Sequence, residues 1–224
     1  MPVIQDRRAA DGQGAAAATD SIGRSVLAAT AAEGGASVIV FEKERSLGGT
    51  SNFFEGTFAV ESSLQRRRYI TYTRDEAFRY IMDYSHWKAN PRLVRAVVDE
   101  SAATIDWLMA QGVEIADTTI NMPDSPQTYH IIRGKGEAVV KALSLKAREK
   151  GCVLKTATPV QRILKQGGNV AGVVIEEDDE EVMVRANTVM VASGGFINNK
   201  DWVKKYTGFE LDVNLVPVGN VDKM

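Results

Sequence analysis

The sequence predicts an α/β fold, in which helices flank a mostly parallel β-sheet that carries a small antiparallel β-meander. Three patterns support this prediction. The apolar run over residues 38–41 is typical of a buried parallel strand, and Gly34-Gly35 ends a helix just before it. Residues 73–150 contain three stretches with the helical spacing of apolar side chains. Residues 158–185 alternate β-rich runs with turn residues, which indicates a meander.

The composition limits the class of protein and the class of partner. The chain has 224 residues, and its 27 Lys and Arg against 29 Asp and Glu give a net charge of −2. No basic stripe is present, so neither a nucleic acid nor an anionic membrane is an expected partner. No uninterrupted apolar run exceeds four residues, whereas a membrane-spanning helix needs about 20. We therefore expect a cytoplasmic protein without a membrane partner.

The scarcity of cysteine and histidine restricts the chemistry further. Cys152 is the only cysteine, and His86 and His130 are the only histidines. These side chains are too few for a disulfide framework, a CxxC redox pair or a zinc site. We therefore expect no metal, and any redox chemistry must come from a bound cofactor.

The first elements of the chain are unevenly defined. Residues 1–24 are rich in Ala, Gly, Asp and Arg and predict no strand, so we expect an atypical segment there, disordered or scrambled. The domain itself is expected over residues 25–224. Residues 26–33 are the end of a helix, and residues 37–41 form the buried strand, which leads into Glu42.

Three helices are expected next. Thr73 and Glu76 form a capping box at the start of the first, whose apolar residues are Phe78, Ile81, Met82 and Trp87. Asn90 and Pro91 open the second helix. Its apolar face consists of Leu93, Val94, Val97, Val98, Ile105 and Leu108. The third helix runs from about residue 137 to residue 150.

Strands dominate the remainder of the chain. Residues 153–156, 158–165, 170–176 and 182–185 have strand-like composition, and turn-forming residues at 166–169 and 178–179 separate the last three. The last clear strand covers residues 188–192. It leads directly into Ser193, Gly194 and Gly195, where missing side chains allow close approach to the backbone.

Glu42 is the first candidate for chemistry. A carboxylate that follows the second strand of a dinucleotide-binding unit accepts hydrogen bonds from a ribose hydroxyl and repels a 2′-phosphate. The alternative is a solvated strand-end glutamate beside Lys43, Glu44 and Arg45.

Two glycine-rich segments are candidates for a cofactor loop. Gly12 and Gly14 begin a G-x-G-x-x-A pattern, but no predicted strand precedes Gly12, and Glu42 follows it by 30 residues where about 20 is usual. An Ala/Gly-rich disordered head is the alternative there. Residues 47–52 place two glycines and two hydroxyls after the Glu42 strand, which suits a loop pressed against a flat cofactor. A plain Gly-Gly turn is the alternative for this loop.

Four motifs in order carry a family resemblance: F-E-K at residues 41–43, G-G-T-S at 48–51, R-G-K-G at 133–136 and V-A-S-G-G-F at 191–196. Over residues 26–224 the chain resembles the FAD-binding domain of the fumarate reductase and succinate dehydrogenase flavoprotein family. The resemblance implies a Rossmann-like domain that binds FAD. The residues that it implies for the cofactor are Glu42, Lys43, Gly48, Gly49, Thr50, Ser51, Gly134, Gly136, Val160, Ser193, Gly194 and Gly195.

All of these residues except Lys43 have an expected role by that resemblance. Glu42 would hold the adenosine ribose, and the backbone of Val160 would contact adenine. Residues 48–51 would line the pyrophosphate and isoalloxazine, and residues 193–195 would lie beside the flavin. Gly134 and Gly136 resemble a Gly-rich helix entry near the flavin, although a plain N-terminal loop is an alternative. The resemblance assigns no catalytic residue.

The remaining histidines and Arg133 have less defined roles. His130 is expected on a surface loop, with a flavin-linked or substrate-facing position as the alternative. His86, on the amphipathic helix beside Trp87, is expected to be structural. Arg133 is a candidate for binding an anion.

The chain departs from the family pattern at two places. The family's spacing puts the fingerprint glycines at positions 19, 21 and 24, which hold Thr19, Ser21 and Arg24. Either Gly12 and Gly14 serve through a helix lengthened by about two turns, or the first βα unit is scrambled. A frame-shifted or misassembled coding start would give such a change. The chain also stops at Met224, where a substrate-capping domain follows in the family.

The sequence therefore predicts the cofactor-binding part of an FAD-dependent oxidoreductase. The complete protein would reduce an activated C=C bond of a small-molecule substrate, or run the reverse reaction. This chain by itself is expected to be inactive. The alternatives are a non-catalytic flavoprotein fragment or binding module, and an NAD(P)-dependent Rossmann enzyme.

Overall fold

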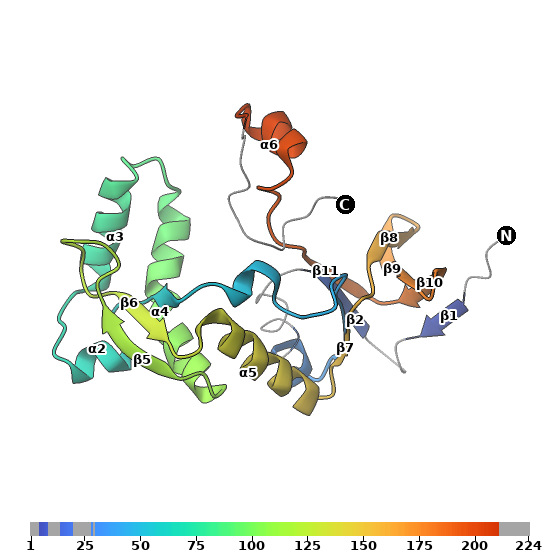
Figure 1. Ribbon diagram of the computed structural model, residues 1–224, viewed down its shortest axis with the longest axis horizontal. Helices are drawn as coiled ribbons and strands as arrows, with labels where there is room; N and C mark the ends of the chain where they lie inside the picture. Colours follow the sequence, from blue (N-terminus) through green and yellow to red (C-terminus); the bar gives the residue numbers. More distant parts are fainter. Residues whose placement is uncertain (1–4, 9–13, 20–27, 29, 211–224) are drawn as a thin grey trace. The chain divides into compact units, whose positions relative to one another are not determined.

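The computed structural model describes residues 5–8, 14–19, 28 and 30–210. The chain divides into two compact units, one made of residues 1–52 with 143–224 and one made of residues 53–142 (Figure 1). Among the described residues, no helix combines the length and the apolar character needed to cross a membrane.

A parallel sheet forms the centre of the first unit. Its strand order is β11 (Thr188–Ala192), β2 (Gly14–Thr19), β3 (Ser37–Phe41) and β7 (Val153–Lys155), and every neighbouring pair is parallel. β2 therefore lies between β11 and β3, although β11 is the last of these four strands in the sequence. The parallel sheet that the sequence predicts is confirmed.

The strands near the N-terminus correct the expectation that residues 1–24 contain none. β1 (Gln5–Arg8) and β2 are both extended, and β2 has the sequence GAAAAT. Alanine favours helices more than strands, so local propensity gives no strand signal there. β2 is a strand because β3 and β11 pair with both of its edges.

The predicted meander is present as a second sheet of the same unit. β8 (Val160–Gln166), β9 (Asn169–Glu177) and β10 (Glu180–Arg185) are antiparallel neighbours, and β1 pairs with β10 in parallel. Gly172 of β9 has a φ of 143°, and a Cβ there would lie 2.1 Å from the carbonyl oxygen of Val184. Only glycine allows β10 to approach β9 so closely.

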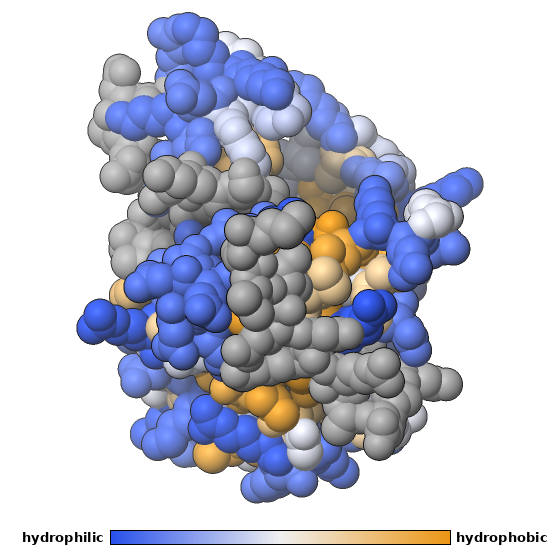
Figure 2. Space-filling model, turned by 90° about the vertical axis from the view of Figure 1, so that its right-hand side faces the viewer, coloured by the Kyte–Doolittle hydropathy of each residue, from blue (hydrophilic) through white to orange (hydrophobic). Residues whose placement is uncertain are grey.

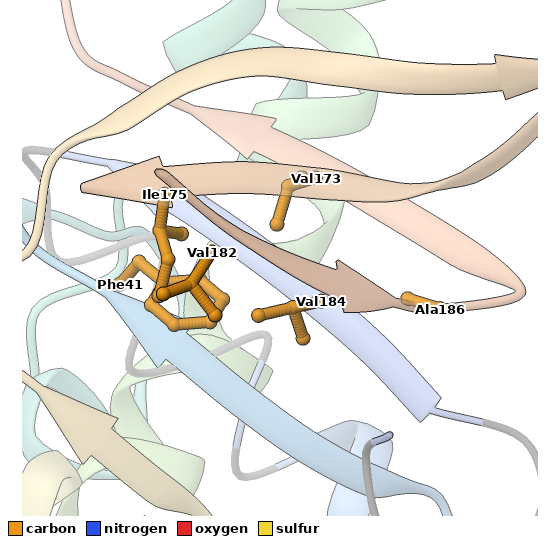
Figure 3. Packing of buried hydrophobic residues seen from close by; sticks show 6 residues of the cluster. All are labelled: Phe41, Val173, Ile175, Val182, Val184 and Ala186. Carbon is orange, nitrogen blue, oxygen red and sulfur yellow. The ribbon is translucent and has the colours of Figure 1, made fainter. Parts of the chain in front are cut away.

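Alternating side chains of β3 connect the layers of this unit. Phe41 packs into a cluster whose other buried members come from the meander and its exit: Val173, Ile175, Val182, Val184 and Ala186 (Figure 3). Val38 and Val40 point to the opposite face, where they pack with Ala28, Ala147 and Cys152. Ala147 belongs to helix α5 (Lys135–Glu149). β3 is therefore covered by the meander on one face and by helical residues on the other.

In the described part of the first unit, residues 30–33 are helical before Gly34, as expected, and two further short helices follow strands. The 3₁₀ helix η1 (Gly49–Asn52) follows β3, and α6 (Lys200–Thr207) follows β11. Asn199 caps α6, and Gly208 ends it in the left-handed conformation.

The second unit combines helices with a three-stranded antiparallel sheet. Its helices are α2 (Ser63–Arg67), α3 (Arg74–Tyr84) and α4 (Pro91–Ala110), and α5 begins in it. Its strands are β4 (Gly56–Phe58), β6 (Tyr129–Ile132) and β5 (Ile115–Thr119), in that order across the sheet. The capping box at Thr73 and the Asn90-Pro91 helix start are confirmed.

Parts of the predicted helical faces are exposed. Met82, Val98, Ile105 and Leu108 are buried as expected, but Trp87, Leu93 and Val97 are 61%, 65% and 53% exposed. Trp87 lies beyond α3, where His86 and Trp87 have φ values of 50° and 57°. Apolar side chains reach the surface elsewhere too, as the orange areas on one face of the molecule show (Figure 2).

Candidate functional site

The candidate cofactor residues of the first unit gather at one edge of its parallel sheet. Glu42 and the loop of residues 47–52 follow β3, and residues 193–195 follow β11. The carboxyl ends of parallel strands share an edge, and β2 separates these two strands. In open α/β sheets, ligands bind outside this edge. The fold thus brings together residues that lie about 150 positions apart in the sequence.

Glu42 is fully buried, which overturns the alternative of a solvated strand-end side chain. Its Oε1 accepts a hydrogen bond of 2.9 Å from the backbone N–H of Glu44. Its own backbone N–H donates to the carbonyl of Lys155, and its carbonyl accepts from the N–H of Thr158, both at 2.8 Å. A buried carboxyl group is costly unless hydrogen bonds satisfy it, and the N–H of Glu44 supplies one such bond. Lys43, by contrast, is exposed.

The loop after Glu42 is a compact turn with one buried glycine. Gly48 is buried with a φ of 107°, and the N–H of Ser51 donates to its carbonyl at 2.9 Å. Gly49, Thr50 and Ser51 are half-buried members of η1. The two glycines lead into this 3₁₀ helix, whose last residue is Asn52.

Val160 is tied to the Glu42 region through the segment between β7 and β8. Thr158, which bonds to Glu42, lies only two residues before Val160, the first residue of β8. The pairing of β8 with β9 shifts its register between Val160 and Arg162. Such a bulge leaves backbone groups out of the ladder.

The turn after β11 is largely exposed to solvent. Ser193 is half-buried, while Gly194 and Gly195 are exposed, and Gly194 has a φ of 79°. This conformation favours glycine, and it leaves the backbone of the turn accessible at the sheet edge.

Gly134 and Gly136 belong to the second unit and shape the start of α5. Gly134 and Lys135 are both left-handed, with φ values of 79° and 57°. The N–H of Gly136 donates to the carbonyl of Phe54 at 2.7 Å. Arg133 lies 2.6 Å from the carboxylate of Glu114, so its guanidinium is already ion-paired.

His130 is fully buried, so its predicted position on a surface loop is wrong. It lies on β6, where its Nε2 is 2.7 Å from the hydroxyl of Ser62 and its Nδ1 is 3.1 Å from the carbonyl of Thr128. The Ser62 oxygen also accepts from the N–H of Gln65 as an N-cap, so its proton is available to His130 Nε2. Burial lowers the pKa of His130 below its ordinary value. The imidazole is therefore neutral and structural.

The expected fingerprint at Gly12 and Gly14 does not fit the strand positions. Gly14 is the first residue of β2, at the amino end of the strand, whereas a pyrophosphate loop follows the carboxyl end. β2 ends at Thr19, which agrees with the fingerprint position inferred from the family's spacing. Gly12, Ser21 and Arg24 lie outside the described residues.

Comparison with known proteins identifies the family. A family model described as the FAD binding domain matches residues 25–218. The chain belongs to this FAD-binding domain family. It is 36% identical over 194 residues to a vinyl phenol reductase of Lactiplantibacillus plantarum, covering 85% of this chain and 39% of the reductase. It is 31% identical over 177 residues to an NADH:fumarate oxidoreductase of Klebsiella pneumoniae, covering 77% and 19% respectively.

Solved structures of the same fold agree with this assignment. A flavocytochrome c3 fumarate reductase in its open conformation has a TM-score of 0.77 at 22% identity, covering 92% of this chain and 36% of its own. A 3-ketosteroid-Δ4-(5α)-dehydrogenase from Rhodococcus jostii has a TM-score of 0.77 at 19% identity, covering 92% and 52%. The chain therefore spans about half, or less, of the length of these proteins.

FAD is the cofactor of this family, and the site residues suit it. A buried strand-end carboxylate offers acceptors for ribose hydroxyls, and glycines at the same sheet edge offer backbone N–H groups without side chains in front of them. The predicted Rossmann-like, FAD-binding domain is confirmed at the level of the family.

One residue that shapes this site was missed in the sequence. Asn52 closes the loop through its side chain, with Nδ2 donating to the carbonyl of Leu47 at 3.1 Å. The available signal was an asparagine three residues after a Gly-Gly pair, because Asn often bonds to nearby backbone. The partner of such a bond depends on the folded loop, so the spacing alone does not reveal it.

Proposed function

We propose that the chain is the FAD-holding part of a flavoprotein that reduces an activated C=C bond of a small molecule, or runs the reverse dehydrogenation. The observation that carries this proposal is the meeting of Glu42, the loop of residues 47–52 and residues 193–195 at one sheet edge. The similarity to a vinyl phenol reductase and to a fumarate oxidoreductase supports the reaction class.

In this proposal, each segment at this edge of the sheet contacts a particular part of FAD. Glu42 accepts hydrogen bonds from the adenosine ribose. The backbone of residues 48–51 contacts the pyrophosphate and the flavin, and residues 193–195 contact the flavin from the β11 side. Val160 offers its backbone to adenine. Lys43, Gly134 and Gly136 stay predictions from the family resemblance. When bound, FAD supplies the hydride chemistry, and the protein supplies position and electrostatics.

Binding of FAD by the purified chain is the direct test. We expect a yellow protein that releases FAD on heating and whose apoprotein binds FAD again, measured by quenching of flavin fluorescence. A colourless protein that does not bind added FAD would contradict the proposal and favour a non-catalytic binding module. Titration with NAD(P)H in place of FAD addresses the Rossmann-enzyme alternative, because saturable binding of the nicotinamide cofactor alone would support it.

A further inference from the structure

The loop of residues 47–52 holds its shape through contacts of its own. The N–H of Ser51 donates to the carbonyl of Gly48 at 2.9 Å, which forms one turn of η1. The Asn52 side chain then reaches back over the whole loop, and its Nδ2 donates to the carbonyl of Leu47 at 3.1 Å. Two hydrogen bonds thus close the segment from which the proposed flavin contacts come.

The fit between Asn52 and Gly48 is close and depends on both residues. A Cβ on Gly48 would lie 2.3 Å from Oδ1 of Asn52 and 2.8 Å from both Cγ and Nδ2. The amide plane therefore occupies the space that any side chain at position 48 would need. The φ of 107° at Gly48 is a second reason for glycine, because L side chains rarely adopt it.

Asn52 differs from a solvated side chain at the end of a surface turn, because it bonds to Leu47 and packs against Gly48. Asn52 is half-buried, and its amide lies against Gly48, which is buried. Short loops of this kind lose conformational entropy when a ligand orders them. A side chain that fixes the loop beforehand reduces that loss.

We infer that Asn52 is a positioning residue that preforms the cofactor loop of residues 47–52. Its amide donates a hydrogen bond to the Leu47 carbonyl and lies against Gly48. The backbone of residues 48–51 is therefore ordered before the cofactor binds. This inference rests on the proposed function of the loop in binding FAD. The order of the loop itself is a property of the apoprotein and can be measured without FAD.

The experiment compares Asn52→Leu and Asn52→Asp with the wild type and with Ser46→Ala. Leucine keeps the approximate volume and removes the donor, while aspartate keeps the shape but presents only acceptors to the Leu47 carbonyl. Ser46 is an exposed neighbour in the same segment and serves as the matched control. The readouts are amide hydrogen exchange of the peptide over residues 47–52 without FAD, the melting temperature of the apoprotein, and the Kd for FAD.

We expect both Asn52 variants to exchange the Ser51 amide about three- to tenfold faster, because a neutral hydrogen bond contributes on that scale. Their melting temperatures should stay close to wild type, and their Kd for FAD should rise by a similar factor. Ser46→Ala should change none of these values. Wild-type exchange in Asn52→Leu would overturn the inference. Failure of the wild type to bind FAD would contradict the proposed function, while the exchange data would still decide whether Asn52 orders the loop.

Discussion

Glu42 is fully buried, which is unusual for a carboxyl side chain, and its Oε1 accepts a hydrogen bond from the backbone N–H of Glu44. The sequence placed an acidic residue after a buried strand, and this part of the site was predictable because strand and carboxylate are adjacent. Its burial was not predictable, because the groups around it come from Glu44, Lys155 and Thr158. Two of those three lie more than 100 residues away in the sequence.

Glu42→Ala should weaken FAD binding at least tenfold. Hydrogen bonds to a charged acceptor contribute about 1.5 to 3 kcal/mol, and tenfold corresponds to about 1.4 kcal/mol. The Kd is measured by flavin fluorescence on apoprotein whose melting temperature is recorded in parallel. Glu44→Ala is the matched control, since that side chain is exposed and its backbone N–H remains. Equal affinity of Glu42→Ala and the wild type would remove Glu42 from the site.

His130 should make the protein less stable in acid. Burial lowers the pKa of its imidazole below the ordinary value of about 6.5. Well above pH 6.5 the ring is neutral in both the folded and the unfolded state and has no effect on stability. As the pH falls below that value, the unfolded chain binds the proton first, so the free energy of unfolding decreases until the folded pKa is passed.

The free energy of unfolding should be lower at pH 5 than at pH 7, and this loss should diminish in His130→Gln. Urea titrations at several pH values measure it. His86→Gln is the control, because His86 is the other histidine and is exposed. An unchanged pH dependence in His130→Gln would show that other groups cause the acid sensitivity.

The elements divide into those that local sequence specifies and those that pairing specifies. The caps at Thr73 and Asn90 and the apolar run of β3 were predictable, because capping and alternation act within a few residues. β2 was missed, since its alanines become a strand only between β3 and β11. β4, β5, β6 and α2 were also missed; they are short, and their irregular patterns give weak signals.

Gly172→Ala should destabilise the meander by about 2 to 4 kcal/mol. The new methyl group would lie 2.1 Å from the Val184 carbonyl oxygen, so β9 and β10 must separate. Gly167→Ala is the matched control in the same meander: its φ is 58°, but nothing lies within 4 Å of the position that its new methyl group would take. It should cost only about 1 kcal/mol. Thermal unfolding compares the two variants, and equal losses would show that strain in φ, rather than the contact, requires glycine at 172.

The molecule as a whole is predicted to bind a cofactor without completing a reaction. Reduction of an activated double bond needs a positioned proton donor and cations for the developing charge, each worth roughly 10²- to 10⁴-fold in rate. His130 is buried and neutral, and Arg133 is paired with Glu114. Neither meets that need.

We therefore expect no turnover of the 224-residue chain with FAD, reduced viologen and fumarate, a crotonate-like acid or an enone steroid. Viologen absorbance measures the rate against a control with free FAD. Substrate-dependent oxidation well above that control would contradict the prediction, and Arg133→Ala would then be the first variant to test.

The position of β2 between β3 and β11 also has a consequence for synthesis on the ribosome. β2 pairs with β3 at residues 14–18 and 37–41, but its other edge pairs with residues 188–192, which emerge much later. Throughout translation of residues 53–142, one edge of β2 therefore lacks its native neighbour. We infer that the cofactor edge of the sheet is completed only after residues 188–192 have left the ribosome. Ribosome-arrested chains ending before and after residue 192, each with a linker that spans the exit tunnel, would test this, because protection of β2 from proteolysis should appear only in the longer chains.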